Sequence, residues 1–270
     1  MAIITISRGS YSKGKEVAEK VAERLGYGCL SREVILEASD RYHIPEIKMI
    51  KAIHNAPTIL ERFNHSKQVF MAYYQSAFTQ RVQKDNVIYH GLAGHLLLNE
   101  VPHVVKVRII ADLNDRIQSE MKRENITEQK AHDAILKDDE ERRKWTQSLY
   151  GRDPWDSALY DLVIHIHKFT VADAVDYICQ AAALEQFATT RESQQKMDDL
   201  TLVCQVKTAL MESYPEISVT CEYGNVLVYT KAEEHIAHKL ETKAKTLGQK
   251  IDGINHIEVH SRVPIPPNAI

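Results

Sequence analysis

Apolar and polar positions divide the chain into two patterns, and the first pattern covers residues 1–185. Within it, short β-branched runs alternate with stretches whose apolar residues recur at helical spacing. The runs lie at residues 3–6, 87–89, 104–110 and 162–166. Short apolar runs separated by helical patterns are typical of a parallel sheet that is covered on both faces. The first pattern therefore predicts an α/β domain, a parallel sheet flanked by helices.

The second pattern covers residues 200–263 and has a different rhythm. Two stretches carry apolar residues at helical spacing, two β-branched runs flank a glycine-containing turn, and a last run alternates like a half-buried strand. The predicted elements are a helix at 200–214, strands at 217–221 and 226–229, a helix at 232–247 and a strand at 254–260. The order αββαβ predicts a small α+β domain.

A polar stretch separates the two patterns, and a proline-rich tail follows the second. Residues 186–199 lose apolar periodicity, which predicts either a linker or an extended helix end. In the tail, residues 264–270, the residues Pro264, Pro266 and Pro267 have no backbone N–H to donate to a neighbouring strand. We therefore expect the tail to lead away from the sheet.

Composition excludes several classes of protein. Lys and Arg number 34 against 37 Asp and Glu, so the net charge of −3 argues against broad nucleic-acid binding. The chain contains no run of 18 or more apolar residues, so the sequence predicts no membrane span. Residues 1–5 lack the basic start of a signal peptide. The 4 cysteines lie far apart, which argues against a zinc ribbon or a disulfide framework. These features predict a soluble cytoplasmic protein.

A turn containing glycine and lysine follows the first predicted strand and precedes a predicted helix. Gly9 and the pair Gly14-Lys15 satisfy most of the phosphate-loop pattern G-x-x-x-x-G-K-[ST], in which backbone N–H groups and a helix start cradle phosphate. Lys13 and Lys15 are candidate catalytic cations, although a tight turn with solvated lysines would show the same spacing. The candidate nucleotide-binding residues of this segment are Arg8, Gly9, Ser10, Ser12, Gly14 and Glu16.

Glu16 departs from the phosphate-loop pattern, since Ser or Thr at this position would offer a hydroxyl to Mg²⁺. A carboxylate about 5 Å from a phosphate charge costs on the order of 3 kcal/mol at an effective dielectric constant near 20. We therefore expect Glu16 either to point away from the phosphate or to meet it only through a metal ion.

Segments beyond the loop carry a further similarity. They are residues 4–8, 16–26, 30–35 and 86–89, Ala111 with Arg116, residues 139–142 with Trp145 and Tyr150, and residues 160–164. Together they resemble the cytidylate kinase-like family of P-loop nucleotide kinases. The resemblance implies a P-loop kinase fold, ATP and Mg²⁺ as cofactors, and phosphoryl transfer to a nucleoside monophosphate such as CMP. Against true cytidylate kinases, Gly14 stands at the phosphate-loop lysine position and Glu16 replaces the threonine.

Arginines outside the loop gain candidate roles from this resemblance. Arg142 and Arg143 lie in the segment similar to the lid helix, where the planar fork of arginine suits closure over donor phosphates. The alternative is a solvent-exposed helix face on which both arginines pair with residues 138–141. Arg116 would face the nucleotide, and Arg32 would hold the phosphate of the acceptor.

Residues 223–228 and 251–257 resemble parts of a BON domain, a small αββαβ module. The resemblance implies a module that binds a ligand or a protein partner and has no catalytic role of its own.

The 13 histidines invite a metal hypothesis. His165 and His167 alternate on one predicted strand face, and His90 and His95 flank a glycine-containing turn. Two ligands on one strand, with no third visible in the sequence, make a weak site. We therefore interpret them as strand-end and surface histidines and expect no metal.

Two functions are open at this point. The first is ATP-dependent phosphoryl transfer to a small-molecule acceptor. The second is a catalytically weak or inactive nucleotide-binding protein that regulates through a ligand or protein partner of its C-terminal domain. The sequence determines neither the acceptor nor the oligomeric state, and a homo-oligomer is one option.

Overall fold

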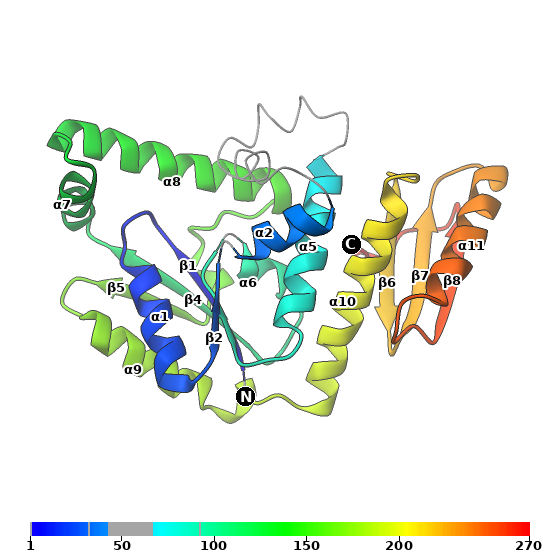
Figure 1. Ribbon diagram of the computed structural model, residues 1–270, viewed down its shortest axis with the longest axis horizontal. Helices are drawn as coiled ribbons and strands as arrows, with labels where there is room; N and C mark the ends of the chain where they lie inside the picture. The colour runs from blue at the N-terminus through cyan, green and yellow to red at the C-terminus, as the bar shows by residue number, and fades with distance from the viewer. Residues whose placement is uncertain (1, 32, 43–66, 92) are drawn as a thin grey trace. The chain divides into compact units, whose positions relative to one another are not determined.

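The computed structural model describes residues 2–31, 33–42, 67–91 and 93–270. Its contacts divide the chain into two compact units, whose elements are labelled in Figure 1. The first unit contains the described residues up to Glu33 and those from Lys84 to Thr190. The second contains the described residues from Val34 to Gln83 and from Arg191 to Ile270.

The first unit is built on a parallel sheet of 5 strands in the order β2-β3-β1-β4-β5. The strands are β1 (Ile3–Arg8), β2 (Gly28–Leu30), β3 (Val87–Tyr89), β4 (Val104–Ala111) and β5 (Leu162–Ile166). This confirms the predicted parallel sheet flanked by helices. The sequence pattern missed only β2 among the described strands of this unit, because β2 begins at the exposed Gly28 and has a single buried residue, Leu30.

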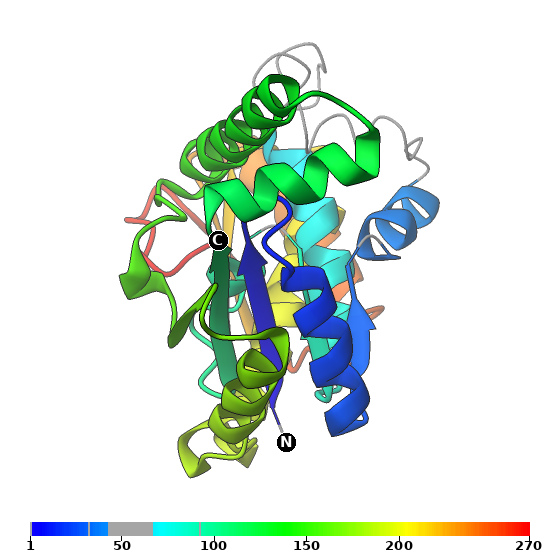
Figure 2. The same cartoon turned by 90° about the vertical axis from the view of Figure 1, so that its left-hand side faces the viewer.

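Helices cover the sheet and lie across the end of it at which β1 and β4 finish. They are α1 (Gly14–Leu25), α6 (Gly94–Leu97), α7 (Leu113–Glu124), α8 (Glu128–Tyr150) and α9 (Val171–Ala182), with the 3-10 turns η1 (Ser157–Leu159) and η2 (Glu185–Phe187). Buried Ile4 and Ile6 of β1 join Val17 of α1 and Ile178 of α9 in one core, so α1 and α9 share a face. Figure 2 shows α7 and α8 lying across the carboxyl ends of β1 and β4.

The second unit contains a sheet of 3 strands in the order β6-β7-β8. Its elements are α2 (Glu33–Arg41), α5 (Lys67–Val82), α10 (Arg191–Met211), β6 (Ile217–Glu222), β7 (Asn225–Thr230), α11 (Glu234–Gly248) and β8 (His256–Ser261). The first residue of α2, Glu33, is counted with the first unit. From α10 onward their order is the predicted αββαβ. Strands β6 and β7 are antiparallel, and β7 and β8 are parallel. Tyr223 and Gly224 join β6 to β7 with φ of 50° and 74°, as a tight hairpin turn requires.

Helix α5 groups with the second unit, although the sequence pattern places its residues within the predicted domain 1–185. The physical reason is a shared core: Ala72 and Tyr73 of α5 are buried together with Val206 and Leu210 of α10.

Two boundary segments are ordered into elements. Residues 186–199, expected as a linker or an extended helix end, contain the end of η2 and the start of α10 at Arg191. The expectation that the tail leads away from the sheet is wrong. The N–H of Ile270 donates to the carbonyl of Val219 at 3.1 Å, and the N–H of Val219 donates to the carbonyl of Ile270 at 2.9 Å. A free edge of β6 accepts this residue even though the prolines before it cannot pair.

Among the helices that the structure describes, none is both long and apolar enough to cross a membrane.

Candidate functional site

The loop between β1 and α1 reverses the chain at the carboxyl end of the sheet's central strand. Tyr11 and Lys13 adopt positive φ values of 60° and 62°, and the hydroxyl of Ser12 donates to the carbonyl of Gly9 at 2.9 Å. Lys13 is the N-cap of α1, and its side chain makes no capping hydrogen bond. The first N–H groups of a helix have no partner within the helix, so this end of α1 is suited to an anion.

The loop requires glycine at its exit. A Cβ atom on Gly14 would lie 2.7 Å from Cβ of Arg8 and 2.8 Å from its Cδ. Real Cβ atoms do not approach this closely, so the missing side chain allows α1 to start directly against β1.

A cavity of about 780 Å³ opens beside the loop, between α1, α7 and α8. Its cationic lining residues are Arg8, Lys13, Lys15, Arg123 and Arg142, and its acidic ones are Glu16, Glu19, Glu120 and Asp138. The structure thus brings most of the predicted charged residues of the loop together with one of the two predicted lid arginines. The cations outnumber the carboxylates by only one, so the lining is close to electrically balanced and presents groups of both signs to a ligand.

Arg116 and Asp139 hold the loop from the side of α7 and α8. Arg116 donates from Nε to the carbonyl of Ser10 at 2.6 Å and from Nη2 to Asp139 at 2.7 Å. The backbone N–H of Ser10 in turn donates to Asp139 at 3.3 Å. A carboxylate of the chain itself therefore accepts a backbone N–H of the candidate phosphate loop.

A second carboxylate, Asp138, meets the same loop. It accepts hydrogen bonds from the hydroxyl of Ser10 and from Nε of Arg142, the latter at 2.8 Å. Arg142 thus pairs within its own helix, as the alternative interpretation expects, and also lines the cavity. Burial, and to a lesser extent the nearby positive charge of Arg142, lower the pKa of Arg8, whereas the charge of Asp138 opposes this shift.

Tyr11 and Arg123 form a contact that sequence reasoning missed. Arg123 donates to the hydroxyl of Tyr11 at 2.7 Å, and its guanidinium carbon lies 4.7 Å from the ring centre. Burial and a hydrogen bond with Glu120 raise the pKa of Tyr11 to about 12. This contact fastens the tip of the loop to α7. The only sequence signal was the charged segment at residues 120–124, and such segments are common on solvated surfaces.

The exposed start of α1 carries two ion pairs. Lys20 lies 2.8 Å from Glu16, and Lys15 lies 3.6 Å from Glu19. Glu16 therefore lines the cavity while its charge is offset by a lysine one helical turn later. Both pairs are solvent-exposed and contribute little to folding stability, which leaves their side chains free to rearrange.

Arg143, the other predicted lid arginine, has its partners outside this cavity. Arg143 forms a two-atom pair with Asp153, the shorter contact being 2.6 Å, and stacks 4.5 Å from the ring centre of Trp155. It does not line the cavity. Arg32, the candidate acceptor-binding residue, lies outside the described residues.

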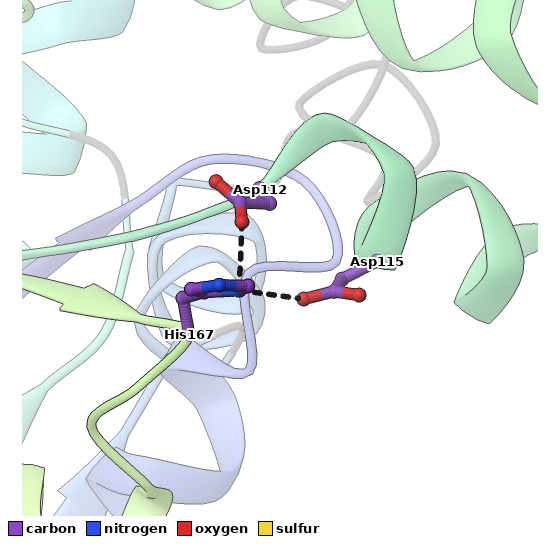
Figure 3. Close-up of side chains that lie close together, drawn as sticks. All are labelled: Asp112, Asp115 and His167. Carbon is purple, nitrogen blue, oxygen red and sulfur yellow. Dashed lines mark ion pairs between the residues drawn. The ribbon is translucent and has the colours of Figure 1, made fainter.

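His165 of β5 and His167, which follows that strand, meet two carboxylates near the end of the neighbouring strand β4. Asp112 follows β4, Asp115 lies in the first turn of α7, and His167 follows β5 (Figure 3). Nδ1 of His167 lies 2.7 Å from Oδ2 of Asp112 and 3.7 Å from Asp115, and Nε2 of His165 lies 3.0 Å from Oδ1 of Asp112. The carboxylates were invisible to the sequence argument because they belong to another strand and helix.

Comparisons with known proteins place the first unit in context. The model of the Cytidylate kinase-like family matches residues 3–168. A crystal structure of an uncharacterized protein from Eubacterium ventriosum is similar at 22% identity, with a TM-score of 0.51, over 67% of this chain and 98% of that chain. This similarity shows a shared fold.

Two kinase structures are also similar, at lower scores. A shikimate kinase from Bacteroides thetaiotaomicron has 8% identity and a TM-score of 0.43, over 68% of this chain and 99% of its own. A gluconokinase from Sinorhizobium meliloti has 13% identity and a TM-score of 0.38, over 67% and 91%. A search of curated proteins found no match to this chain.

Proposed function

This chain belongs to the cytidylate kinase-like family, and on that premise we propose that its first unit transfers the terminal phosphoryl group of ATP to a small acceptor. We take a nucleoside monophosphate, with CMP first, as the acceptor class. In the transfer, an acceptor oxygen bonds to the γ-phosphorus while the bond from that phosphorus to the β–γ bridging oxygen breaks, which releases ADP. Such a reaction depends mainly on positioning and charge neutralisation.

The observation that carries this proposal is the pair of carboxylates at the loop. Asp138 accepts a hydrogen bond from the hydroxyl of Ser10 and pairs with Arg142. Asp139 accepts a hydrogen bond from the N–H of Ser10 and pairs with Arg116. A carboxylate and a phosphate are both oxygen anions that accept hydrogen bonds from the same donors. The loop is therefore equipped for oxygen anions, and a triphosphate would compete with the chain's own carboxylates.

The cationic residues of the cavity suit the nucleotide, and its acidic residues suit a metal ion. Lys13, Lys15 and Arg142 would contact the phosphates. Mg²⁺ prefers oxygen ligands and keeps several waters, and Glu16 and Asp138 line the same cavity. These two carboxylates would hold Mg²⁺ directly or through water. When bound, the ion would offset the phosphate charge.

A second candidate function is nucleotide-dependent regulation without efficient turnover. One observation favours it: Glu16 stands where a hydroxyl would hold Mg²⁺. We infer for this case that the second unit is a BON-like module that binds a ligand or a protein partner. The element order α10-β6-β7-α11-β8 supports the inference.

The test is a calorimetric titration of ATP, with and without Mg²⁺, into the wild type and into the double variant Lys13→Ala/Lys15→Ala. The matched control is Lys137→Ala/Lys144→Ala, which removes two lysines that pair with glutamates on α8 and do not line the cavity. The same samples are assayed for ADP release with a panel of nucleoside monophosphates.

Each outcome separates the candidates. Binding that is lost in the loop variant and kept in the control, together with acceptor-dependent ADP release, supports the kinase. Binding without turnover supports regulation. If ATP does not bind to the wild type, both proposals are wrong.

A further inference from the structure

The side chains of Asp112, Asp115 and His167 converge on one point outside the nucleotide cavity (Figure 3). One ligand atom of each residue lies within 4.8 Å of the others. The three residues come from the end of β4, the first turn of α7 and the turn after β5. Three separate elements of a packed sheet edge thus present these groups, which makes their convergence a property of the fold.

The usual role of an aspartate at this position does not explain Asp112. It is the N-cap residue of α7, where an aspartate side chain typically accepts an N–H of the first helical turn. Its side chain makes no such bond. Both carboxylate oxygens instead face histidines: Oδ2 lies 2.7 Å from His167 and Oδ1 lies 3.0 Å from His165.

Charge neutralisation by a basic side chain does not explain the cluster either. Among the ion pairs of the described residues, Asp112 and Asp115 have histidines as their partners and no lysine or arginine. The two carboxylates offer negative charge that a divalent cation would balance.

The spacing and the donor types suit a transition metal. Tetrahedral zinc sites have metal–ligand distances of about 2.0–2.2 Å, which separates their ligand atoms by roughly 3.4 Å. Nδ1 of His167 lies 2.7 Å from Asp112 and 3.7 Å from Asp115, on either side of this value. Imidazole nitrogen favours zinc and its neighbours over Mg²⁺ and Ca²⁺.

We propose that Asp112, Asp115 and His167 bind a divalent transition-metal ion, with Zn²⁺ as the first candidate. Oδ2 of Asp112, a carboxylate oxygen of Asp115 and Nδ1 of His167 are the ligands, and water or a ligand oxygen completes the coordination. His165 is a positioning residue: it holds Oδ1 of Asp112 and thereby orients Oδ2 toward the ion. Hydrogen-bonding partners of metal ligands commonly have this effect.

The proposed metal site is independent of the proposed kinase function, because none of its ligands lines the nucleotide cavity. The experiment therefore omits nucleotide. The full chain is treated with a chelator, desalted and titrated with Zn²⁺ by calorimetry, and the visible absorption of bound Co²⁺ reports the coordination. We expect saturation at one tight-binding ion per chain.

Variants of the ligands test the assignment. Asp112→Asn and His167→Ala should each weaken Zn²⁺ binding by at least about tenfold. His165→Ala should weaken it by roughly tenfold, whereas His165→Gln retains a side-chain N–H donor and should recover most of that loss. These side chains are about half exposed, so the variants should fold, and circular dichroism of the metal-free proteins checks this.

Two control variants distinguish this cluster from other histidine–carboxylate pairs. His132→Ala removes an exposed histidine that lies 3.3 Å from Asp133. His256→Ala/His260→Ala removes the pair that flanks Glu258 on β8. Both should leave the affinity for Zn²⁺ within twofold of the wild type. The proposal is overturned if the wild type binds no Zn²⁺ saturably, or if Asp112→Asn and His167→Ala bind as tightly as the wild type.

Discussion

The guanidinium of Arg116 lies 2.7 Å from the carboxylate of Asp139, and that carboxylate also accepts the backbone N–H of Ser10 at 3.3 Å. Both groups of the pair are largely buried, with exposed side-chain fractions of 11% and 14%. A helix of the chain thus places an anion on the candidate phosphate loop. A bound triphosphate would have to displace or rearrange this carboxylate, so nucleotide affinity should be sensitive to it.

Asp139→Asn should strengthen ATP binding. The substitution keeps the shape of the side chain and removes the negative charge that competes with phosphate for Ser10 and Arg116. We expect a three- to tenfold lower Kd, corresponding to about 1 kcal/mol, measured by calorimetry. Glu140→Gln, which removes an exposed carboxylate paired with Lys144 on the same helix, is the control and should leave Kd unchanged. Weaker binding in Asp139→Asn would show instead that Asp139 preorganises the loop.

The adjacent arginines of α8 should differ in their effect on nucleotide binding. Arg142 lines the cavity, whereas Arg143 pairs with Asp153 and stacks on Trp155. Arg142→Ala should raise the Kd for ATP by roughly five- to thirtyfold, since a charged hydrogen bond contributes about 1–2 kcal/mol. Arg143→Ala should stay within about twofold of the wild type. Equal losses in the two variants would mean that α8 rotates on binding and brings both arginines to the phosphates.

Acid should destabilise the folded protein through His95. Burial and the charge of Arg108 lower the pKa of His95 from 6.5 to about 3. Between these values the unfolded chain binds the proton and the folded chain does not. This contribution to stability is therefore complete above pH 6.5 and is lost as the pH falls toward 3, by up to about 1.4 kcal/mol per pH unit.

Urea unfolding at pH 7 and pH 5 measures this loss. His95→Gln should lose less stability than the wild type between the two pH values, because glutamine does not titrate. The control His132→Gln replaces an exposed histidine and should keep the wild-type difference. If His95→Gln and the wild type lose the same free energy, His95 does not carry the effect.

Asp199→Ala should destabilise the second unit. Asp199 is buried, and its carboxylate accepts the N–H groups of Tyr223 and Gly224, each at 2.9 Å, at the turn between β6 and β7. Removing it leaves the N–H of the buried Gly224 and that of Tyr223 without their acceptor, which costs about 2–4 kcal/mol. Urea unfolding followed by circular dichroism measures the loss. Lys196→Ala, an exposed substitution on the same helix, should change stability by less than about 0.5 kcal/mol.

Local periodicity predicted much of the fold, because the spacing of apolar residues along the chain indicates whether a segment forms a strand or a helix. The runs at residues 87–89 and 162–166 coincide with β3 and β5, and the αββαβ order of the second pattern is present. The loop between β1 and α1 was visible for the same reason, since Gly9, Gly14 and Lys15 lie within one short segment. Strand β2 lacks this signal, because only Leu30 of its 3 residues is buried, whereas all 3 residues of β3 are buried.

The partners of the site residues were decided only by the tertiary structure. Ser10 meets Asp139 across 129 positions of sequence, and His167 meets Asp112 only because β4 and β5 lie side by side in the sheet. Asp199 falls in a polar stretch that the sequence leaves as a linker or a helix end, yet it is buried beneath a hairpin turn. By itself, the sequence determined which segments become strands, helices and the loop, since these depend on neighbouring residues. Which charges meet depends on how those segments pack, so the anion at the loop and the cluster at Asp112 emerged only in the folded chain.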